Sequence, residues 1–277
     1  MSKEDGIDLE QKFTCLLTLL EEAESAVLAF SGGVDSSFLL RAMKTAGLRF
    51  TAVTGRSETV PAQALLQAAA FAGREGVAHT VIPTGEMQNE LFLGNPPDRC
   101  FFCKQDLYKR LRKIAETENF RYVFDGSNAD DHNDYRPGRK AAALAGVRSP
   151  LAECGLSKRD IRLLSRQLGL ETWDMPASPC LASRFPYGQR ITPELLKKVE
   201  EAEDFLKTLG MKTVRVRAHG DMARIEMPEE DMARILEDGL RRHLTGTLRA
   251  LGFTFISLDL EGFRSGSMNR SLPREMR

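Results

Sequence analysis

Short apolar runs alternate with helically spaced apolar positions through the first half of the chain. Residues Leu9–Glu24 repeat apolar side chains at helical spacing, and the run SAVLAF at 25–30 is short enough for a buried strand. Further strands are predicted at 50–55, 78–84 and 122–124, with helices at 38–46 and 61–76. This alternation is typical of a parallel sheet with helices on both faces, so we expect an α/β fold.

The second half predicts a smaller α/β domain. The segment WDMPASP at 173–179 interrupts the pattern with prolines, and a new helix is expected after Thr192, which can cap it, with Pro193 in its first turn. Strands near 213–218, 222–227 and 253–260, a helix at 229–244 and a loose tail from 262 complete the expectation. The predicted organisation is a first domain over 1–174, a linker over 175–191 and a second domain over 192–277.

Composition and charge narrow the setting. The chain has 277 residues, 42% hydrophobic, which is enough for one large or two modest cores. Lys plus Arg and Asp plus Glu both total 39, so no overall field attracts nucleic acid or an anionic membrane, and neither is expected as a partner. The charged N-terminus and the lack of an apolar run of about 20 residues predict a cytoplasmic protein without a membrane span. Five cysteines in such a chain predict reduced thiols rather than a disulfide framework.

The strongest chemical signal is SGGVDSS at residues 31–37, between a predicted strand and a predicted helix. Gly32 and Gly33 let the backbone approach a ligand closely, and the N-terminus of the following helix favours an anion. Hydroxyl donors come from Ser31, Ser36 and Ser37. Asp35 is better suited to a metal ion that bridges to a phosphate. The loop therefore predicts a phosphate site at a strand end, with a ligand-free turn as the alternative.

SGGVDSS resembles the pyrophosphate loop of the PP-loop ATP-pyrophosphatases, and the GK[ST] ending of a Walker A loop is absent. The resemblance implies a doubly covered parallel sheet that binds ATP and Mg²⁺. It also implies cleavage of ATP between the α- and β-phosphates and transfer of AMP to an acceptor oxygen, with Asp35 as a catalytic residue.

Three further stretches extend the resemblance over nearly the whole chain: DGSNADDHNDYRPG at 125–138, SPCLASRFPYGQR at 178–190 and VRVRAHGDMARIE at 214–226. Together with the loop they are similar to the LarE-type ATP-dependent sulfur transferases of nickel-pincer nucleotide biosynthesis. That family implies adenylation of a carboxylate on pyridinium-3,5-biscarboxylic acid mononucleotide, followed by sulfur insertion to give a thiocarboxylate. It also implies a sulfide source as partner and a homo-oligomer.

The cysteines suggest how sulfur is supplied. The family assigns the cysteine matching Cys180 to sulfur donation, and single-cysteine members sacrifice it. In RCFFCK at 99–104, Cys100 and Cys103 add two thiols. Three such cysteines hold a [4Fe–4S] cluster with one open iron in related sulfur transferases, so Cys100, Cys103 and Cys180 are the expected cluster ligands. A zinc site, a redox dithiol and a sacrificial Cys180 remain alternatives. Cys15 and Cys154 are interpreted as structural.

The remaining candidates are polar residues in loops and on a strand. Asn128, Asp131 and Asp134 are expected to orient nucleotide or metal and Arg136 to contact a phosphate, with a polar surface loop as the alternative. Arg215 and Arg217 alternate with valines and suit a mononucleotide phosphate, and Arg184 lies close enough in sequence to Cys180 to hold an anionic substrate. His219 is not expected to be catalytic.

Two other functions remain open. A tRNA-thiolating enzyme shares the loop and the three cysteines, although the balanced charge argues against it. A nucleotide-binding regulator without turnover would share the loop alone.

Overall fold

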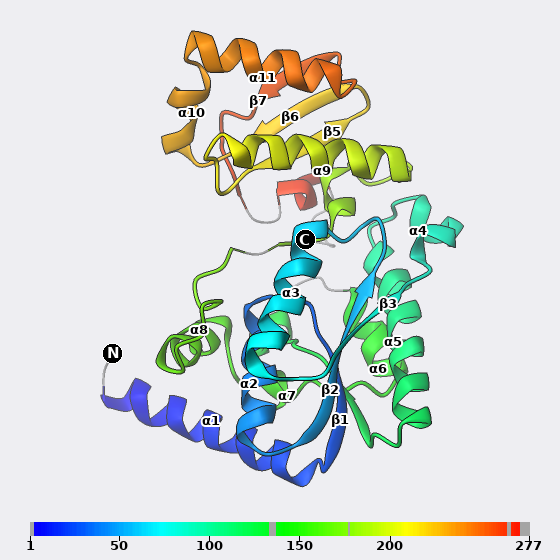
Figure 1. Cartoon of the computed structure of the whole chain (residues 1–277), viewed down its shortest axis with the longest axis vertical. Helices are drawn as coiled ribbons and strands as arrows, with labels where there is room; N and C mark the ends of the chain where they lie inside the picture. Colours follow the sequence, from blue (N-terminus) through cyan, green and yellow to red (C-terminus); the bar gives the residue numbers. More distant parts are fainter. Residues whose placement is uncertain (1–2, 133–136, 177, 265–266, 272–277) are drawn as a thin grey trace. The chain divides into compact units, whose positions relative to one another are not determined.

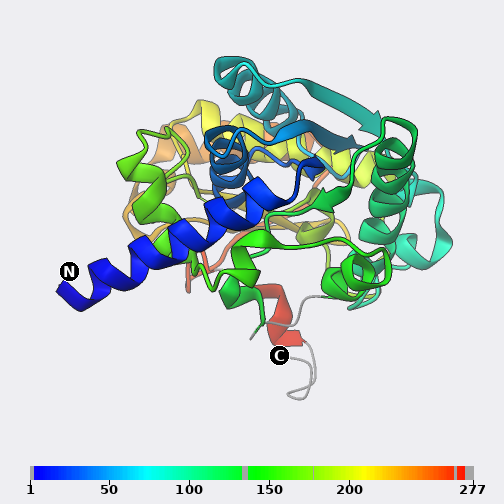
Figure 2. The same ribbon diagram turned by 90° about the horizontal axis from the view of Figure 1, so that it is seen from below.

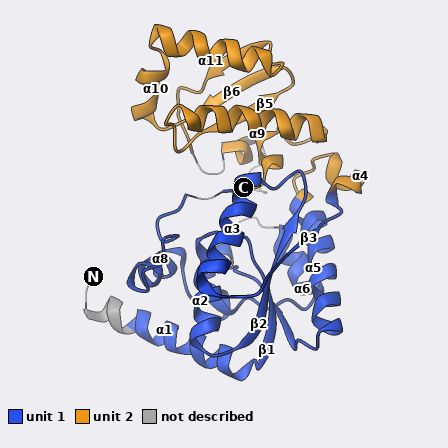
Figure 3. Ribbon diagram, viewed as in Figure 1, with its two compact units in different colours: residues 1–86, 100–178 blue, residues 87–99, 179–277 orange. Residues whose placement is uncertain are grey.

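The chain divides into two units, each formed from two separate segments (Figure 3). Unit 1 comprises Met1–Glu86 and Cys100–Ser178, and unit 2 comprises Met87–Arg99 and Pro179–Arg277. The computed structural model describes residues 3–132, 137–176, 178–264 and 267–271. Each unit is described by itself below.

Unit 1 is built on a parallel sheet of four strands, which confirms the expected α/β fold. The strands are β1 (Ser25–Ala29), β2 (Arg49–Arg56), β3 (His79–Pro83) and β4 (Tyr122–Phe124), in the order β3-β2-β1-β4. All three pairings are parallel, and Leu28 of β1 lies opposite Ala52 on one side and Phe124 on the other. The carboxyl ends of the four strands therefore lie along one edge of the sheet.

Helices cover both faces of this sheet (Figures 1 and 2). They are α1 (Lys3–Glu22), α2 (Val34–Thr45), α3 (Ala62–Glu75), α5 (Arg99–Thr117), α6 (Pro137–Leu144), α7 (Pro150–Glu153) and α8 (Lys158–Gln167), with the 3₁₀ turn η2 (Ala129–His132). Neighbouring side chains of β1 point to opposite faces. Leu28 belongs to the core beneath α1, α2, α3, α7 and α8, whereas Val27 belongs to the core beneath α5 and α6.

Helix α2 begins at Val34, directly after Gly33, and not at Phe38 as the pattern predicts. The hydroxyl of Ser36 accepts from the amide of Ser31 at 3.3 Å and donates to the carbonyl of Gly33 at 3.2 Å. Asp35 in the first turn adds a favourable charge at the helix N-terminus. These local interactions, which apolar periodicity does not register, start the helix one turn earlier. As a result, Asp35, Ser36 and Ser37 all lie in its first turn.

Unit 2 contains a sheet of three strands, β5 (Arg215–His219), β6 (Met222–Glu226) and β7 (Phe255–Leu258), in that order. The β5–β6 pair is antiparallel and the β6–β7 pair is parallel. The helices are α4 (Glu90–Leu93), α9 (Pro193–Thr208), α10 (Glu229–Ile235) and α11 (Asp238–Ala250), with the 3₁₀ turns η3 (Leu181–Arg184) and η4 (Ser267–Ser271). Thr192 caps α9 as predicted, since its hydroxyl accepts from the amide of Leu195 at 3.3 Å.

Two details of unit 2 differ from the sequence expectation. The single helix expected at 229–244 is two helices, because α10 ends with Leu236 as its C-cap and α11 starts at Asp238. The tail expected to be loose contains η4, whose Ser267 hydroxyl lies within hydrogen-bonding distance of Glu226.

The segment 87–99 joins unit 2 through hydrogen bonds to residues 185–191. The side-chain amide of Asn95 donates to the carbonyl of Pro186 at 2.7 Å, and the carbonyl of Asn95 accepts from the amide of Gly188 at 2.9 Å. The amide of Ile191 donates to the carbonyl of Leu93 at 2.8 Å. Asn95 is fully buried, so these bonds satisfy groups that water cannot reach.

Cys15 of α1 and Cys154 after α7 form a disulfide. The expectation of reduced thiols is therefore wrong for this pair, because helices 139 positions apart in sequence bring the two sulfurs together in the folded unit. Cys100, Cys103 and Cys180 are not part of a disulfide. In the described part of the chain, no helix combines the length and the apolar character needed to cross a membrane.

Candidate functional site

The SGGVDSS loop follows β1 at the carboxyl edge of the unit 1 sheet. Gly32 has φ +73°, and a Cβ there would lie 2.9 Å from both Cα and Cβ of Ala68 in α3. Any larger residue would therefore clash with a helix backbone in addition to adopting a strained conformation. Gly32 fixes the path of the loop against α3.

Gly33 has a different surrounding. A Cβ at Gly33 would meet only the hydroxyl of Ser31, at 3.5 Å, so the protein itself leaves room for a side chain. Ser31 and Ser36 hydroxyls lie 3.1 Å apart, and the hydroxyl of Ser37 is buried without a hydrogen-bond partner among the described residues. A polar loop at the start of a twelve-residue helix, with open space beside it, suits an anion.

Asp35 pairs with a lysine that the sequence analysis missed. The Lys158 ammonium donates to Asp35 Oδ2 at 2.6 Å, whereas Asp35 Oδ1 is buried and has no hydrogen-bond partner in the described residues. Lys158 is the first residue of α8, and Ser157 and Asp160 cap the start of this helix with the reciprocal hydrogen bonds of a capping box. The pattern SKRD at 157–160 could have predicted this helix start, but not its proximity to Asp35.

The end of β4 lies beside the start of α2. A Cβ on Gly126 would lie 3.0 Å from the amide nitrogen of Ser36, so this glycine allows the two backbones to approach. The preceding Asp125 accepts hydrogen bonds from the hydroxyls of Tyr108 at 2.7 Å and Ser149 at 2.6 Å. Burial, followed by the Asp125 charge, raises the pKa of Tyr108 well above its usual value. Tyr108 therefore stays a neutral donor, and Asp125 anchors the strand end.

Asn128 has a local structural role. Its Oδ1 accepts from the amide of Asp130 at 3.0 Å, and its own amide donates to Asp131 Oδ2 at 3.0 Å. Asp130 Oδ2 in turn accepts from the amide of Lys158 at 2.8 Å, which ties this loop to the start of α8. The predicted contact of Asn128 with nucleotide stays a prediction. Asp134 and Arg136 lie outside the described residues.

A second buried carboxylate in unit 1 was not anticipated. Glu86 is 2% exposed, and its Oε1 accepts from the hydroxyls of Ser57 at 2.5 Å and Thr59 at 3.2 Å. Its Oε2 is buried without a partner in the described part of the chain. All three residues follow strands β2 and β3, at the edge of the sheet that carries the SGGVDSS loop.

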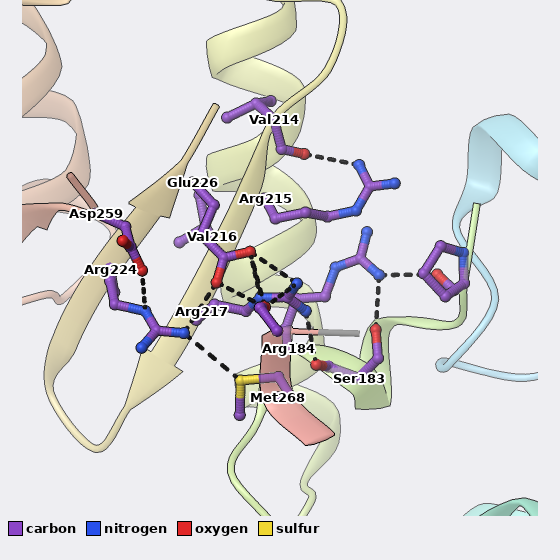
Figure 4. A network of polar contacts seen from close by, with 12 residues as sticks. Ser183, Arg184, Val214, Arg215, Val216, Arg217, Arg224, Glu226, Asp259 and Met268 are labelled. Atoms are coloured by element: carbon purple, nitrogen blue, oxygen red, sulfur yellow. Dashed lines mark hydrogen bonds and ion pairs between the residues drawn. The ribbon is translucent and has the colours of Figure 1, made fainter. Parts of the chain in front are cut away.

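In unit 2, Arg184 holds the segment that carries Cys180 (Figure 4). The Arg184 guanidinium forms two hydrogen bonds of 2.8 Å with Glu203 of α9. Its Nη1 donates to the carbonyls of Pro179 at 2.8 Å and Cys180 at 3.2 Å. Both charged side chains are almost completely buried. Arg184 thus fixes the backbone at the half-buried Cys180, and its predicted contact with substrate stays a prediction.

Arg217 of β5 is also committed to a carboxylate. Its Nε and Nη2 donate to Glu226 Oε2 of β6 at 3.0 and 2.8 Å, and its Nη1 donates to the carbonyl of Ser183 at 2.9 Å (Figure 4). The Glu226 side chain is fully buried and also accepts from Arg224 at 2.9 Å. This network joins β5, β6 and the Cys180 segment.

Arg215, the first residue of β5, is also buried. Its Nη1 donates to the carbonyl of Val214 at 2.7 Å, and its guanidinium lies 5.3 Å from the ring centre of Phe263. Burial, together with the charge of Arg184, lowers the pKa of Arg215 to about 10.

The three remaining cysteines belong to different units. Cys100 and Cys103 are the second and fifth residues of α5 in unit 1, and Cys180 lies in unit 2 just before η3. Positions i and i+3 of a helix share a face, so Cys100 and Cys103 can bind one metal centre together. Across the described residues, no three His, Cys, Asp or Glu side chains gather as a metal site.

A parallel sheet whose first strand leads through SGGVDSS into a helix defines an α/β protein of the PP-loop type. No family model matches the chain. It is 43% identical over 267 residues to an uncharacterized protein of Synechocystis sp., covering 96% of this chain and all of the relative. It is 38% identical over 270 residues to the pyridinium-3,5-bisthiocarboxylic acid mononucleotide synthase of Lactiplantibacillus plantarum, covering 96% of each chain. The protein therefore belongs to the family of LarE-type sulfur transferases. An uncharacterized Methanocaldococcus jannaschii protein is 29% identical over 86% of this chain and 90% of the relative.

Proposed function

We propose that this protein is an ATP-dependent, AMP-forming sulfurtransferase of nickel-pincer nucleotide biosynthesis, acting on pyridinium-3,5-biscarboxylic acid mononucleotide. The observation that carries the proposal is the SGGVDSS loop with its Asp35–Lys158 pair, in a chain 38% identical to a pyridinium-3,5-bisthiocarboxylic acid mononucleotide synthase. Adenylation makes chemical sense for this substrate. A carboxylate resists a sulfur nucleophile because oxide is a poor leaving group, whereas AMP leaves readily.

The loop supplies the groups for the first step. Backbone amides at Gly32 and Gly33 and the N-terminus of α2 bind the β- and γ-phosphates. Mg²⁺ would be held by Asp35, whose buried Oδ1 has no partner in the described ranges of the chain, and carboxylate oxygen is a ligand that Mg²⁺ favours. Lys158 stabilises the charge of the departing pyrophosphate.

The arginine network of unit 2 supplies an anion site for the mononucleotide phosphate. Arg215 is the candidate because its guanidinium is buried where the charges of Arg184 and Arg217 act on it, and an anion is attracted to such a group of cations. A bound phosphate would offset the burial and the Arg184 charge that lower the pKa of Arg215.

Sulfur reaches the adenylated carboxylate from the segment of Cys180. A [4Fe–4S] cluster would be held by Cys100, Cys103 and Cys180, and when bound it would supply an open iron able to carry an extra sulfide. The donor set fits in chemistry, since all three residues keep their thiols outside the Cys15–Cys154 disulfide. A sacrificial Cys180 without a cluster is the alternative source of sulfur. Assembly into a cytoplasmic homo-oligomer, which the family resemblance implies, belongs to the same proposal.

The test is an anaerobic assay with ATP, Mg²⁺, sulfide and the dicarboxylate mononucleotide. We expect pyrophosphate release that depends on the mononucleotide, and a product heavier by the exchange of oxygen for sulfur. The Asp35→Asn variant should abolish both. Pyrophosphate release stimulated by tRNA and not by the mononucleotide would replace this proposal with a tRNA-thiolating enzyme.

A further inference from the structure

Arg99 is a buried cation whose guanidinium the described residues leave largely unsatisfied. Arg99 is only 7% exposed, and both its Nε and its Nη1 are buried without a hydrogen-bond partner among the described residues. The guanidinium carbon lies 4.9 Å from the ring centre of Tyr187, also in unit 2. This contact orients the side chain but satisfies no N–H group.

The chain holds Arg99 and Tyr187 in place from both sequence segments of unit 2. Asn95, four residues before Arg99, donates from its side chain to the carbonyl of Pro186 next to Tyr187. The Tyr187 hydroxyl donates to Asn269 at 2.9 Å. Tyr187 ends the segment that begins at Cys180, so Arg99 is anchored to the segment of the proposed sulfur donor.

Within the part of the chain that the structure describes, two other buried arginines of unit 2 have a carboxylate partner, unlike Arg99. Arg184 has Glu203 and Arg217 has Glu226 as a fully buried carboxylate partner. Leaving a buried guanidinium without a partner costs stability, and most native proteins avoid it. No carboxylate of the described residues takes this role for Arg99. An oxyanion from outside the chain would satisfy it.

We propose that Arg99 binds a ring carboxylate of the mononucleotide substrate. This inference rests on the proposed function. That substrate carries one phosphate and two carboxylates, and Arg215 is the candidate for the phosphate. One carboxylate is activated at a time, so the other needs a cationic partner while the first reacts. Arg99 then makes the enzyme selective for a dicarboxylate over a monocarboxylate, because a ligand without the second carboxylate leaves the guanidinium unsatisfied.

Two variants test the assignment. Arg99→Met keeps an unbranched apolar stem and removes the guanidinium with its charge. The matched control Arg190→Met changes an arginine of the same unit that is 57% exposed and paired with Glu90. Binding of three probes is measured by calorimetry: the mononucleotide substrate, pyridine-3,5-dicarboxylate and ribose 5-phosphate. We expect Arg99→Met to weaken the first two at least tenfold and to leave the third unchanged. Its Tm without ligand should equal or exceed that of the wild type. The control should match the wild type throughout.

The opposite results are equally clear. Unchanged binding of the substrate by Arg99→Met would overturn this inference and leave the proposed function intact. A loss confined to ribose 5-phosphate would assign Arg99 to the phosphate instead. Failure of the wild type to bind the substrate would reject the proposed function and this inference together. If Arg99→Met loses both stability and binding, Arg99→Lys decides: restored binding of pyridine-3,5-dicarboxylate supports the role, and no restored binding overturns it.

Discussion

The ammonium of Lys158 lies 2.6 Å from Oδ2 of Asp35, a residue 123 positions earlier in the chain. Each of these residues occupies the first turn of its helix, Asp35 in α2 and Lys158 in α8. The pair places a cation beside the SGGVDSS loop, while Asp35 Oδ1 has no hydrogen-bond partner among the residues that the structure describes. One carboxylate can therefore serve both the lysine and a bound Mg²⁺.

Lys158→Met should lower kcat/KM for pyrophosphate release by about 10- to 100-fold, the usual effect of losing one charged hydrogen bond near the reacting phosphates. Steady-state kinetics over substrate concentrations from below to above KM measure this. The control is Lys44→Met, which removes a lysine near the other end of α2 that pairs with Glu75 of α3. This variant should leave kcat/KM unchanged. Equal effects of both variants would contradict the role of Lys158.

The two loop glycines should respond differently to alanine. Gly32→Ala should destabilise the fold by about 1–3 kcal/mol, because the conformation is strained and Ala68 blocks the new methyl group. Gly33→Ala should leave Tm nearly unchanged and reduce ATP affinity, since its methyl group would enter the open side of the loop. Thermal denaturation and nucleotide titration separate the two effects. A Gly33→Ala variant with normal ATP affinity would place the phosphates elsewhere.

Replacing Arg217 should mainly affect stability, whereas replacing Arg215 should mainly affect substrate binding. Arg217→Met leaves Glu226 as an unpaired buried charge and should cost about 3–5 kcal/mol of unfolding free energy. Arg215→Met should instead weaken binding of the mononucleotide phosphate. Since the pKa of Arg215 is lowered to about 10, the cation that binds phosphate is lost as pH rises through that value. Wild-type affinity should therefore fall above about pH 10, and the Arg215→Met affinity should not follow it.

Reduction of the Cys15–Cys154 disulfide should lower Tm, because the bond closes a loop with a sequence separation of 139. Loops of this size correspond to about 2–5 kcal/mol in chain-entropy terms. Denaturation with and without a thiol reductant measures the effect. Cys15→Ser should show no reductant dependence, and a wild type with the same Tm in both conditions would mean that the bond is absent in solution.

Cys180→Ala should retain pyrophosphate release and lose sulfur transfer, since the SGGVDSS loop belongs to the other unit. Mass spectrometry after turnover then distinguishes the two sulfur sources. If a cluster supplies the sulfur, the mass of the wild-type chain stays unchanged after turnover. Cys100→Ala and Cys103→Ala should then lose both the cluster and sulfur transfer. A chain lighter by one H₂S, with both of these variants active for one turnover, would establish a sacrificial Cys180.

The fold and the position of the SGGVDSS loop between a strand and a helix were predictable because their signals are local. The runs around Leu28 and Val53 alternate with helical spacing, and SGGVDSS is a contiguous motif. Helix starts were less predictable, since side-chain hydrogen bonds such as those of Ser36 extend α2 beyond its apolar pattern.

Long-range pairing explains what the sequence did not reveal. Lys158 is recognised only through Asp35, and Arg217 only through Glu226, because charge pairing depends on which elements the fold brings together. The strand pattern predicts that Arg217 binds substrate, which stays a prediction, but it does not reveal the bond to Glu226. The Cys15–Cys154 bond was missed for the same reason.

Unit 2 is formed from two segments that lie far apart in the sequence, and this affects both its synthesis and its separation from unit 1. The backbone passes between the units at Glu86–Met87, at Arg99–Cys100 and at Ser178–Pro179. During synthesis the segment 87–99 emerges long before residues 185–191, so Asn95 waits for its carbonyl partners until the C-terminal half is translated. A fragment that stops at Ser178 would expose that segment unpaired. Cutting the gene at a single point therefore cannot release either unit intact.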